Sequence, residues 1–242
     1  MFSRRPGPRF TRGRIAAGGG AAEETPATIM GANCVEWWRA DLGVTIATGV
    51  SQWTGQVGGK NWSQGTAGAQ PAFNAAGGPN STPSIALDGI DDFMDCDALV
   101  RAVPTAVLWM IARQTIWTSG DSLINDASAT LVLLQQLASP NIRMFAGTGV
   151  NIVNLAVGTF GRIQAEFTAS TSDRLLIVAT SATGASAGTV DGTQPLLGRN
   201  AASTTFGAGE FCEIAFFDAI PSAGQQTILD NYVTSRYGAG LV

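Results

Sequence analysis

Histidine is absent from the 242 residues, and its absence removes several kinds of chemistry. Imidazole-based triads, histidine general bases and histidine-ligated zinc all need that side chain. A glycoside hydrolase needs only two carboxylates, and Glu166 and Glu213 are the acids that stand inside apolar, strand-like runs. Because alternate side chains of a strand face solvent, the pattern favours outward-facing or paired residues over catalytic ones. We therefore expect a protein that is not an enzyme.

Three carboxylates cluster in the segment DGIDD, at Asp88, Asp91 and Asp92, with Asp95 and Asp97 close behind. Carboxylate oxygens are the ligands that calcium prefers, but the spacing is not that of an EF-hand loop. Acidic side chains in turns commonly accept hydrogen bonds from nearby backbone amides. The segment therefore predicts a self-capping turn and no cofactor, with calcium binding as the alternative.

Six tryptophans could offer flat surfaces for sugar rings. Trp53 and Trp62 stand in a segment rich in glycine and asparagine, which is typical of a loop. Trp37 and Trp109 stand in strand-like runs and are expected in the core. Because large aromatic side chains dominate core packing, the sequence favours burial of the tryptophans. The alternative is glycan binding, for which the candidate residues are Trp53, Trp62, Asp88, Asp91 and Asp92.

Arginines crowd the beginning of the chain, which has five of the 14 basic residues and no acid before Glu23. The other nine basic residues stand against 18 acidic ones, so the body is acidic and is not expected to bind nucleic acid. Residues 1–27 mix Arg, Pro, Gly and Ala without periodicity, which predicts a flexible basic arm before one domain at 28–242. The arm could contact nucleic acid, serve as a solubilising tail or bind a neighbouring subunit. We expect the last, through Phe2, Arg4, Arg5, Arg9, Phe10, Arg12 and Arg14.

The three cysteines, Cys34, Cys96 and Cys212, are odd in number and mostly in apolar surroundings, which predicts buried thiols and synthesis in a reducing cytoplasm. The pair Arg4 and Arg5 is not followed by the apolar run of an export signal. No stretch approaches the roughly 18 apolar residues of a transmembrane helix, so we expect no membrane partner.

The positioning elements are predicted to be strands, because short apolar runs alternate with Gly, Ser, Asn and Pro. Helices do not alternate with these runs, which favours an antiparallel sandwich or barrel. Asp191 and Gly192 predict a hairpin turn. The candidate strands are 106–113, 130–137, 142–147, 150–157, 174–181 and 211–218.

One helix is predicted near the end of the chain. Ser222 and Gln225 have the spacing of a capping box, and Gly238 fits the stop. Between them lies an apolar stripe that should face a sheet, formed by Ile228, Leu229, Tyr232 and Val233.

Three stretches together resemble the laminin G-like, concanavalin A-like domain family. They are WWRADLGVTI with VSQWTGQVGGKNWSQGTAGAQPAF, then PSIALDGIDDFMDC, and finally RLLIVATSATGASAGTVDGTQPLLGRN leading into GEFCEIAFFDAIPSAGQQTILDNYVTSRYG. Leu87 stands where the family pattern has an aromatic residue. The resemblance covers most of residues 34–238. It implies an all-β jelly-roll sandwich of two antiparallel sheets, with one short C-terminal helix after the extended N-terminal arm.

Members of the resembled family bind glycans, bind proteins or fill space in larger assemblies, so the fold alone does not decide the function. Domains of the resembled family occur in phage structural proteins. Together with the basic arm, a neutral surface rich in small residues and a cytoplasmic cysteine pattern without an export signal, the resemblance implies a structural protein of a bacteriophage particle. In this interpretation it is a capsid decoration, head-fibre or tail-associated subunit, made in the host cytoplasm and located in the virion, with other virion proteins and its own copies as partners. The alternative is a carbohydrate-binding module for adhesion or receptor recognition on cell-surface glycan. A glycoside hydrolase or lyase comes third.

Overall fold

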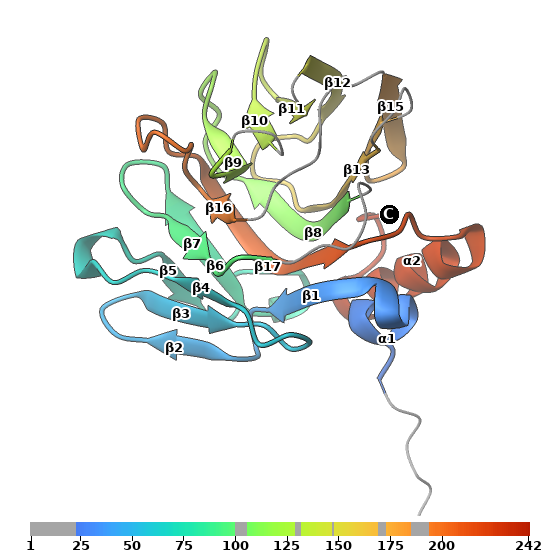
Figure 1. Cartoon of the computed structure of the whole chain (residues 1–242), viewed down its shortest axis with the longest axis horizontal. Coiled ribbons are helices and arrows are strands. Elements are labelled where there is room, and N and C mark those ends of the chain that lie inside the picture. The colour runs from blue at the N-terminus through green and yellow to red at the C-terminus, as the bar shows by residue number, and fades with distance from the viewer. Residues whose placement is uncertain (1–22, 100–105, 129–131, 147, 169–172, 185–193) are drawn as a thin grey trace, which may run out of the picture.

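A computed structural model describes residues 23–99, 106–128, 132–146, 148–168, 173–184 and 194–242 (Figure 1). Two antiparallel sheets, of eight and nine strands, make up most of it. The expected all-β jelly-roll sandwich with a C-terminal helix is therefore confirmed. The turn at Asp191 and Gly192 and the arm residues lie outside the described part, namely Phe2, Arg4, Arg5, Arg9, Phe10, Arg12 and Arg14.

The eight-stranded sheet is formed by β1 (Cys34–Arg39), β5 (Ala72–Asn74), β6 (Ser84–Asp88), β8 (Ala106–Gln114), β13 (Gly161–Phe167), β14 (Asp173–Ile177), β15 (Thr180–Gly184) and β17 (Ala208–Phe217). Its order is β15-β14-β13-β8-β17-β6-β5, and β1 also pairs with β17. The long strand β17 thus has β8 on one edge, and β6 followed by β1 on the other.

The nine-stranded sheet is formed by β2 (Val44–Ile46), β3 (Val50–Thr54), β4 (Asn61–Ser63), β7 (Met94–Cys96), β9 (Ser122–Asp126), β10 (Val132–Gln135), β11 (Asn141–Ala146), β12 (Thr148–Asn154) and β16 (Pro195–Leu197). Its order is β12-β11-β10-β9-β16-β7-β4-β3-β2. The described chain also has short 3-10 turns at Gly31–Asn33, Ala67–Ala69 and Pro79–Ser81.

Two apolar clusters stabilise the sandwich, one between the sheets and one between the eight-stranded sheet and the helices α1 (Pro26–Met30) and α2 (Ala223–Tyr237). Strand β8 contributes to both clusters because its side chains point alternately to its two faces. Ala106, Leu108, Met110 and Ala112 join the inter-sheet cluster, and Val107, Trp109 and Ile111 join the helix-side cluster. Figure 1 shows both helices on the same side of the molecule.

The C-terminal helix forms as its end signals predict. The Ser222 side chain accepts a hydrogen bond from the Gln225 amide, and the Gln225 side chain accepts one from the Ser222 amide. Gly238 ends the helix with a positive φ of 95°. Of the expected stripe, Leu229, Tyr232 and Val233 are buried and Ile228 is exposed. No helix among the described residues combines the length and apolar character needed to span a bilayer.

Each predicted strand run contains a strand in the structure. Two runs form shorter strands than predicted, and one run forms two strands. The run expected at 174–181 is wrong as one strand, because β14 and β15 form an antiparallel hairpin that turns at Val178, whose φ is 52°. Helix α1 begins at Pro26, within the segment 1–27 that composition assigned to the arm. The run at 106–113 lies in β8, the described residues of 142–147 lie in β11, and all but the last residue of 211–218 lie in β17. The described residues of 130–137 form β10 only over Val132–Gln135, and the run at 150–157 leaves β12 after Asn154.

Candidate functional site

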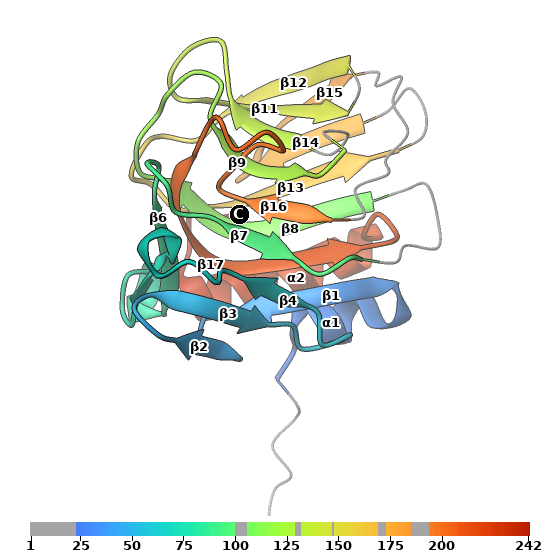
Figure 2. The ribbon, with the colours of Figure 1, turned by 60° about the vertical axis from the view of Figure 1, so that its left-hand side comes forward.

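The chain places several irregular connections at one end of the sandwich, which we call the loop end. The strand register places these connections together, because β6 ends at Asp88 and β8 ends at Gln114. These two residues pair with Ala208 and Gly209 at the start of β17. In the other sheet Leu197, the last residue of β16, pairs with Ile124 of β9, and the chain after Leu197 runs into the same end. The left-hand side of Figure 2 shows this end. The loop end comprises 64–71, 89–93, 115–121, 136–140, 155–160 and 198–207.

Burial of Trp53 and Trp62, which the sequence favoured, is confirmed, and the alternative of glycan stacking by these two residues is wrong. Both side chains are 0% exposed and belong to the cluster between the sheets. Trp62 packs against Trp38 with ring centres 5.4 Å apart, and the Trp53 indole N–H donates to the Arg39 carbonyl at 3.0 Å. The glycine and asparagine residues that suggested a loop instead flank short strands of the nine-stranded sheet, whose alternate residues point inward.

Trp117 is the tryptophan that retains solvent contact, since the other five are at most 6% exposed. It lies at the loop end in the connection between β8 and β9, and its indole N–H donates to the Asn141 carbonyl at 3.0 Å. Ile116 and Leu137, on neighbouring loops, are 57% and 61% exposed. The sequence reasoning missed Trp117, although the residues that follow it, TSGD, are typical of a turn.

A second group at the loop end is built around Arg199. Its Nη2 donates to both carboxylate oxygens of Asp95, at 2.7 and 2.8 Å. Its guanidinium carbon lies 4.6 Å from the centre of the Phe93 ring, in cation–π contact. The Phe93 and Phe206 rings are 6.2 Å apart and both are partly exposed. These residues present a planar charged pair beside two aromatic rings.

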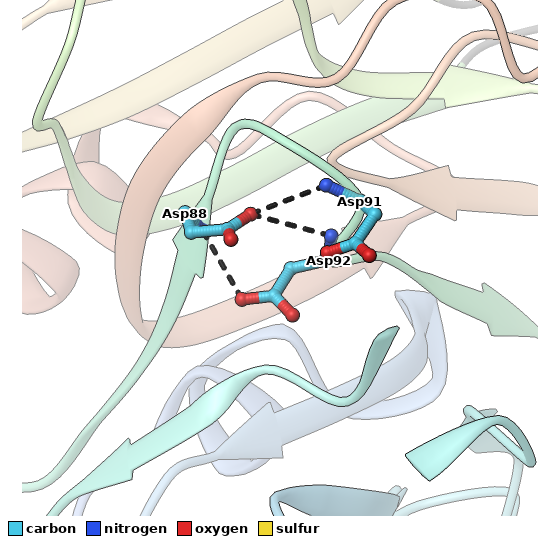
Figure 3. Close-up of side chains that lie close together, drawn as sticks. All are labelled: Asp88, Asp91 and Asp92. Carbon is cyan, nitrogen blue, oxygen red and sulfur yellow. Dashed lines mark hydrogen bonds between the residues drawn. The ribbon is translucent and has the colours of Figure 1, made fainter. Parts of the chain in front are cut away.

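The acidic turn lies next to this group, and Figure 3 shows its three side chains close together. Their carboxylate oxygens lie within 4.8 Å of one another, which would suit an oxygen-liganded cation. However, Asp88 Oδ1 accepts from the amides of Ile90, Asp91 and Asp92 at 2.8, 3.3 and 3.4 Å, and Asp92 Oδ2 accepts from the Asp88 amide at 3.2 Å. The self-capping turn is confirmed, and calcium binding stays the alternative.

Asp92 is the buried member of the turn, at 8% exposed. Burial, with the neighbouring charge of Asp88, raises the pKa of Asp92 to about 6. Asp88 and Asp91 remain exposed and contribute negative charge to this part of the loop end.

The two acids considered for glycoside hydrolysis lie away from the loop end. Glu213 is 0% exposed beneath α2, where it accepts hydrogen bonds from Tyr232 and Tyr237. Glu166 is 3% exposed and pairs with the Arg174 guanidinium, with Nε 2.9 Å from Oε2. Both are paired strand residues, as the sequence favoured, and neither opens to a substrate in this conformation.

No protein-family model matches this chain, and no curated protein matches it in sequence. Solved structures share its fold at low identity. An arabinofuranosidase complexed with arabinofuranosyl-alpha-1,2-xylobiose is 14% identical, with a TM-score of 0.55 over 79% of this chain and 52% of that chain. Domain 4 of AbnA, a GH43 extracellular arabinanase from Geobacillus stearothermophilus in complex with arabinotriose, is 11% identical, with a TM-score of 0.56 over 81% of this chain and 98% of that chain.

The binding domain of botulinum neurotoxin serotype G is 8% identical, with a TM-score of 0.53 over 84% of this chain and 51% of that chain. The present chain thus spans about half the length of the arabinofuranosidase and neurotoxin structures, and matches nearly all of the arabinanase domain. At these identities the likeness establishes the β-sandwich fold, which is compatible with the lectin-like jelly roll that the sequence resembles.

Proposed function

We propose that this protein is a carbohydrate-binding β-sandwich domain and that a glycan binds at its loop end. The observation that carries the proposal is Trp117, the partly exposed tryptophan among six, which is anchored by its indole N–H to the Asn141 carbonyl. A fixed aromatic face can pack against the C–H face of a sugar ring, and it loses little conformational entropy when it does so. Support comes from the similar arabinanase domain, which was solved with arabinotriose.

The charges around the acidic turn favour a neutral glycan at this part of the loop end. Asp88 and Asp91 are exposed, and the guanidinium of Arg199 is already paired with Asp95. A polyanionic glycan would meet the repulsion of these carboxylates without a free basic partner in this group. The Arg199–Asp95 pair and the turn backbone instead offer hydrogen-bonding groups of the kind that bind sugar hydroxyls.

The test is a screen of neutral and uronate-containing oligosaccharides with the full chain, followed by calorimetry on any ligand found. Trp117→Ala should weaken binding at least about tenfold, the equivalent of roughly 1.4 kcal/mol, because it removes the stacking surface. Ile220→Ala is the matched control, since Ile220 is 40% exposed and lies beyond the end of β17 that is opposite to the loop end. Equal affinities for the two variants, or binding restricted to uronate-rich glycans, would contradict the proposed site.

The bacteriophage structural role inferred from the sequence is a separate prediction. It depends on the basic arm, whose residues lie outside the described part of the chain. A domain that binds glycan could also be a subunit of such a particle, so the two proposals are compatible. They require different experiments, and the one for the arm is given below.

A further inference from the structure

The loop that bears Trp117 is wrapped around one buried side chain, Gln135. Gln135 is the last residue of β10 and is 0% exposed. Its Nε2 donates to the Ile116 carbonyl at 2.7 Å, and its Oε1 accepts from the Thr118 amide at 2.8 Å. The two residues that flank Trp117 are therefore both held by a single amide group.

The backbone of Gln135 holds the remainder of the same loop. Its carbonyl accepts from the Gly120 amide at 2.6 Å, and its amide donates to the Asp121 carbonyl at 2.8 Å. The loop from Ile116 to Asp121 thus makes four hydrogen bonds to one residue. Few alternative conformations of this loop could keep all four.

A second buried amide, Gln114, connects this loop to two others. Gln114 is 0% exposed at the end of β8, and its Oε1 accepts from Gln135 Nε2 at 2.8 Å. Its own Nε2 donates to the Pro140 carbonyl at 2.7 Å and to the Leu155 carbonyl. Asn141, which accepts the Trp117 indole N–H, directly follows Pro140. The anchor of the indole ring and the loop that carries the ring are therefore tied to the same pair of glutamines.

Burial of two side-chain amides is costly unless their hydrogen bonds are made, and a network of this kind favours one arrangement over others. Here the polar pair is placed where three loops meet, next to the exposed apolar side chains. We propose that Gln135 and Gln114 are positioning residues that fix the Trp117 ring for ligand before the ligand arrives. The inference rests on the proposed function, with a neutral oligosaccharide as the ligand.

The test compares Gln135→Met with Gln164→Met. Methionine has a length similar to glutamine and makes no comparable hydrogen bonds. Gln164 is a matched control because it is also 0% exposed and hydrogen-bonded, to Glu166 and Gln226, but lies on β13 beneath α2. Two quantities are measured on the full chain: the NMR signal of the Trp117 indole N–H, assigned from Trp117→Phe, and the affinity for the oligosaccharide found with the wild type.

We expect Gln135→Met to shift or broaden the Trp117 indole signal and to weaken binding at least about tenfold. Gln164→Met should lose comparable thermal stability while leaving the Trp117 signal and the affinity unchanged. If Gln135→Met does not fold, Gln135→Asn replaces it; this variant keeps an amide but is one methylene too short to reach both Ile116 and Thr118. The same changes are expected, at smaller size.

An unchanged Trp117 signal in the Gln135 variant would overturn the positioning role, and so would a changed signal with wild-type affinity. Failure of the wild type to bind any glycan would instead count against the proposed function. The two failures are distinguishable because the indole signal is recorded without ligand.

Discussion

At the scale of single residues, Glu213 is a carboxylic acid whose burial changes its protonation. Its carboxylate is fully buried between β17 and α2, and it accepts hydrogen bonds from Trp37, Tyr232 and Tyr237. All three donors are neutral, so they only partly compensate the cost of burying a charge. Burial raises the pKa of Glu213 to about 7, against hydrogen bonds and the charge of Arg39, which act to lower it.

This pKa has a consequence for stability. The folded state binds the proton more tightly than the unfolded state, whose carboxyl titrates near 4.5. The contribution of the protonated Glu213 carboxyl to the free energy of unfolding is therefore complete below about pH 4.5, and it is lost as pH rises through about 7. The side chain in Glu213→Gln is neutral at every pH. This variant should therefore lose on the order of 3 kcal/mol less of its free energy of unfolding than the wild type between pH 4.5 and pH 7.

The measurement is urea unfolding at intervals from pH 4 to pH 8. Asp92→Asn is the comparison, because the pKa of Asp92 is also raised, to about 6, and its removal should affect only the lower part of the same range. A Glu213→Gln profile parallel to that of the wild type would show that the buried carboxylate does not titrate in this range.

At the scale of elements, α2 illustrates what local sequence can specify. Its start and end were predictable because the capping box and Gly238 act within a few residues of one another. The turn at Val178 was not predictable, because a β-branched residue at positive φ is held there by tertiary pairing of β14 and β15. The loop predicted around Trp53 and Trp62 was wrong for the related reason that the position of these residues is decided by a sheet formed from distant segments.

Removing the cap of α2 provides a test at this scale. Ser222→Ala leaves the Gln225 amide without its side-chain acceptor and should cost about 1 kcal/mol. For a domain of this size that corresponds to a decrease in melting temperature of about 2–4 °C. Ser235→Ala, an exposed position in the body of α2, is the control and should change the melting temperature much less. Equal effects at the two positions would mean that the cap does not stabilise the helix.

At the scale of the whole molecule, the basic arm and the acidic body can be tested separately. A chain that begins at Glu23 keeps the ion pair of Glu23 with Arg39, whose atoms are 3.0 Å apart, and all described elements. We expect its melting temperature and glycan affinity to equal those of the full chain. If the arm binds neighbouring subunits, light scattering should give a lower mass for the shortened chain.

The matched control for the arm replaces its five arginines by glutamine and preserves its length. Loss of assembly in both the shortened and the substituted chains would identify the charges as the binding groups. An identical mass for all three proteins would contradict a role of the arm in subunit contact and would remove the main support for the particle interpretation.

The two edge strands of the nine-stranded sheet, β12 and β2, differ in length and in what they pack against. Strand β12 packs against β14 and β15 of the opposite sheet, so its free side faces protein. Strand β2 ends the sheet order at the other side, and it is only three residues long, Val44–Ile46. Another chain could therefore add few backbone hydrogen bonds there, and short edges of this kind oppose aggregation through strand addition. Copies crowded on one surface would therefore not be joined through this edge.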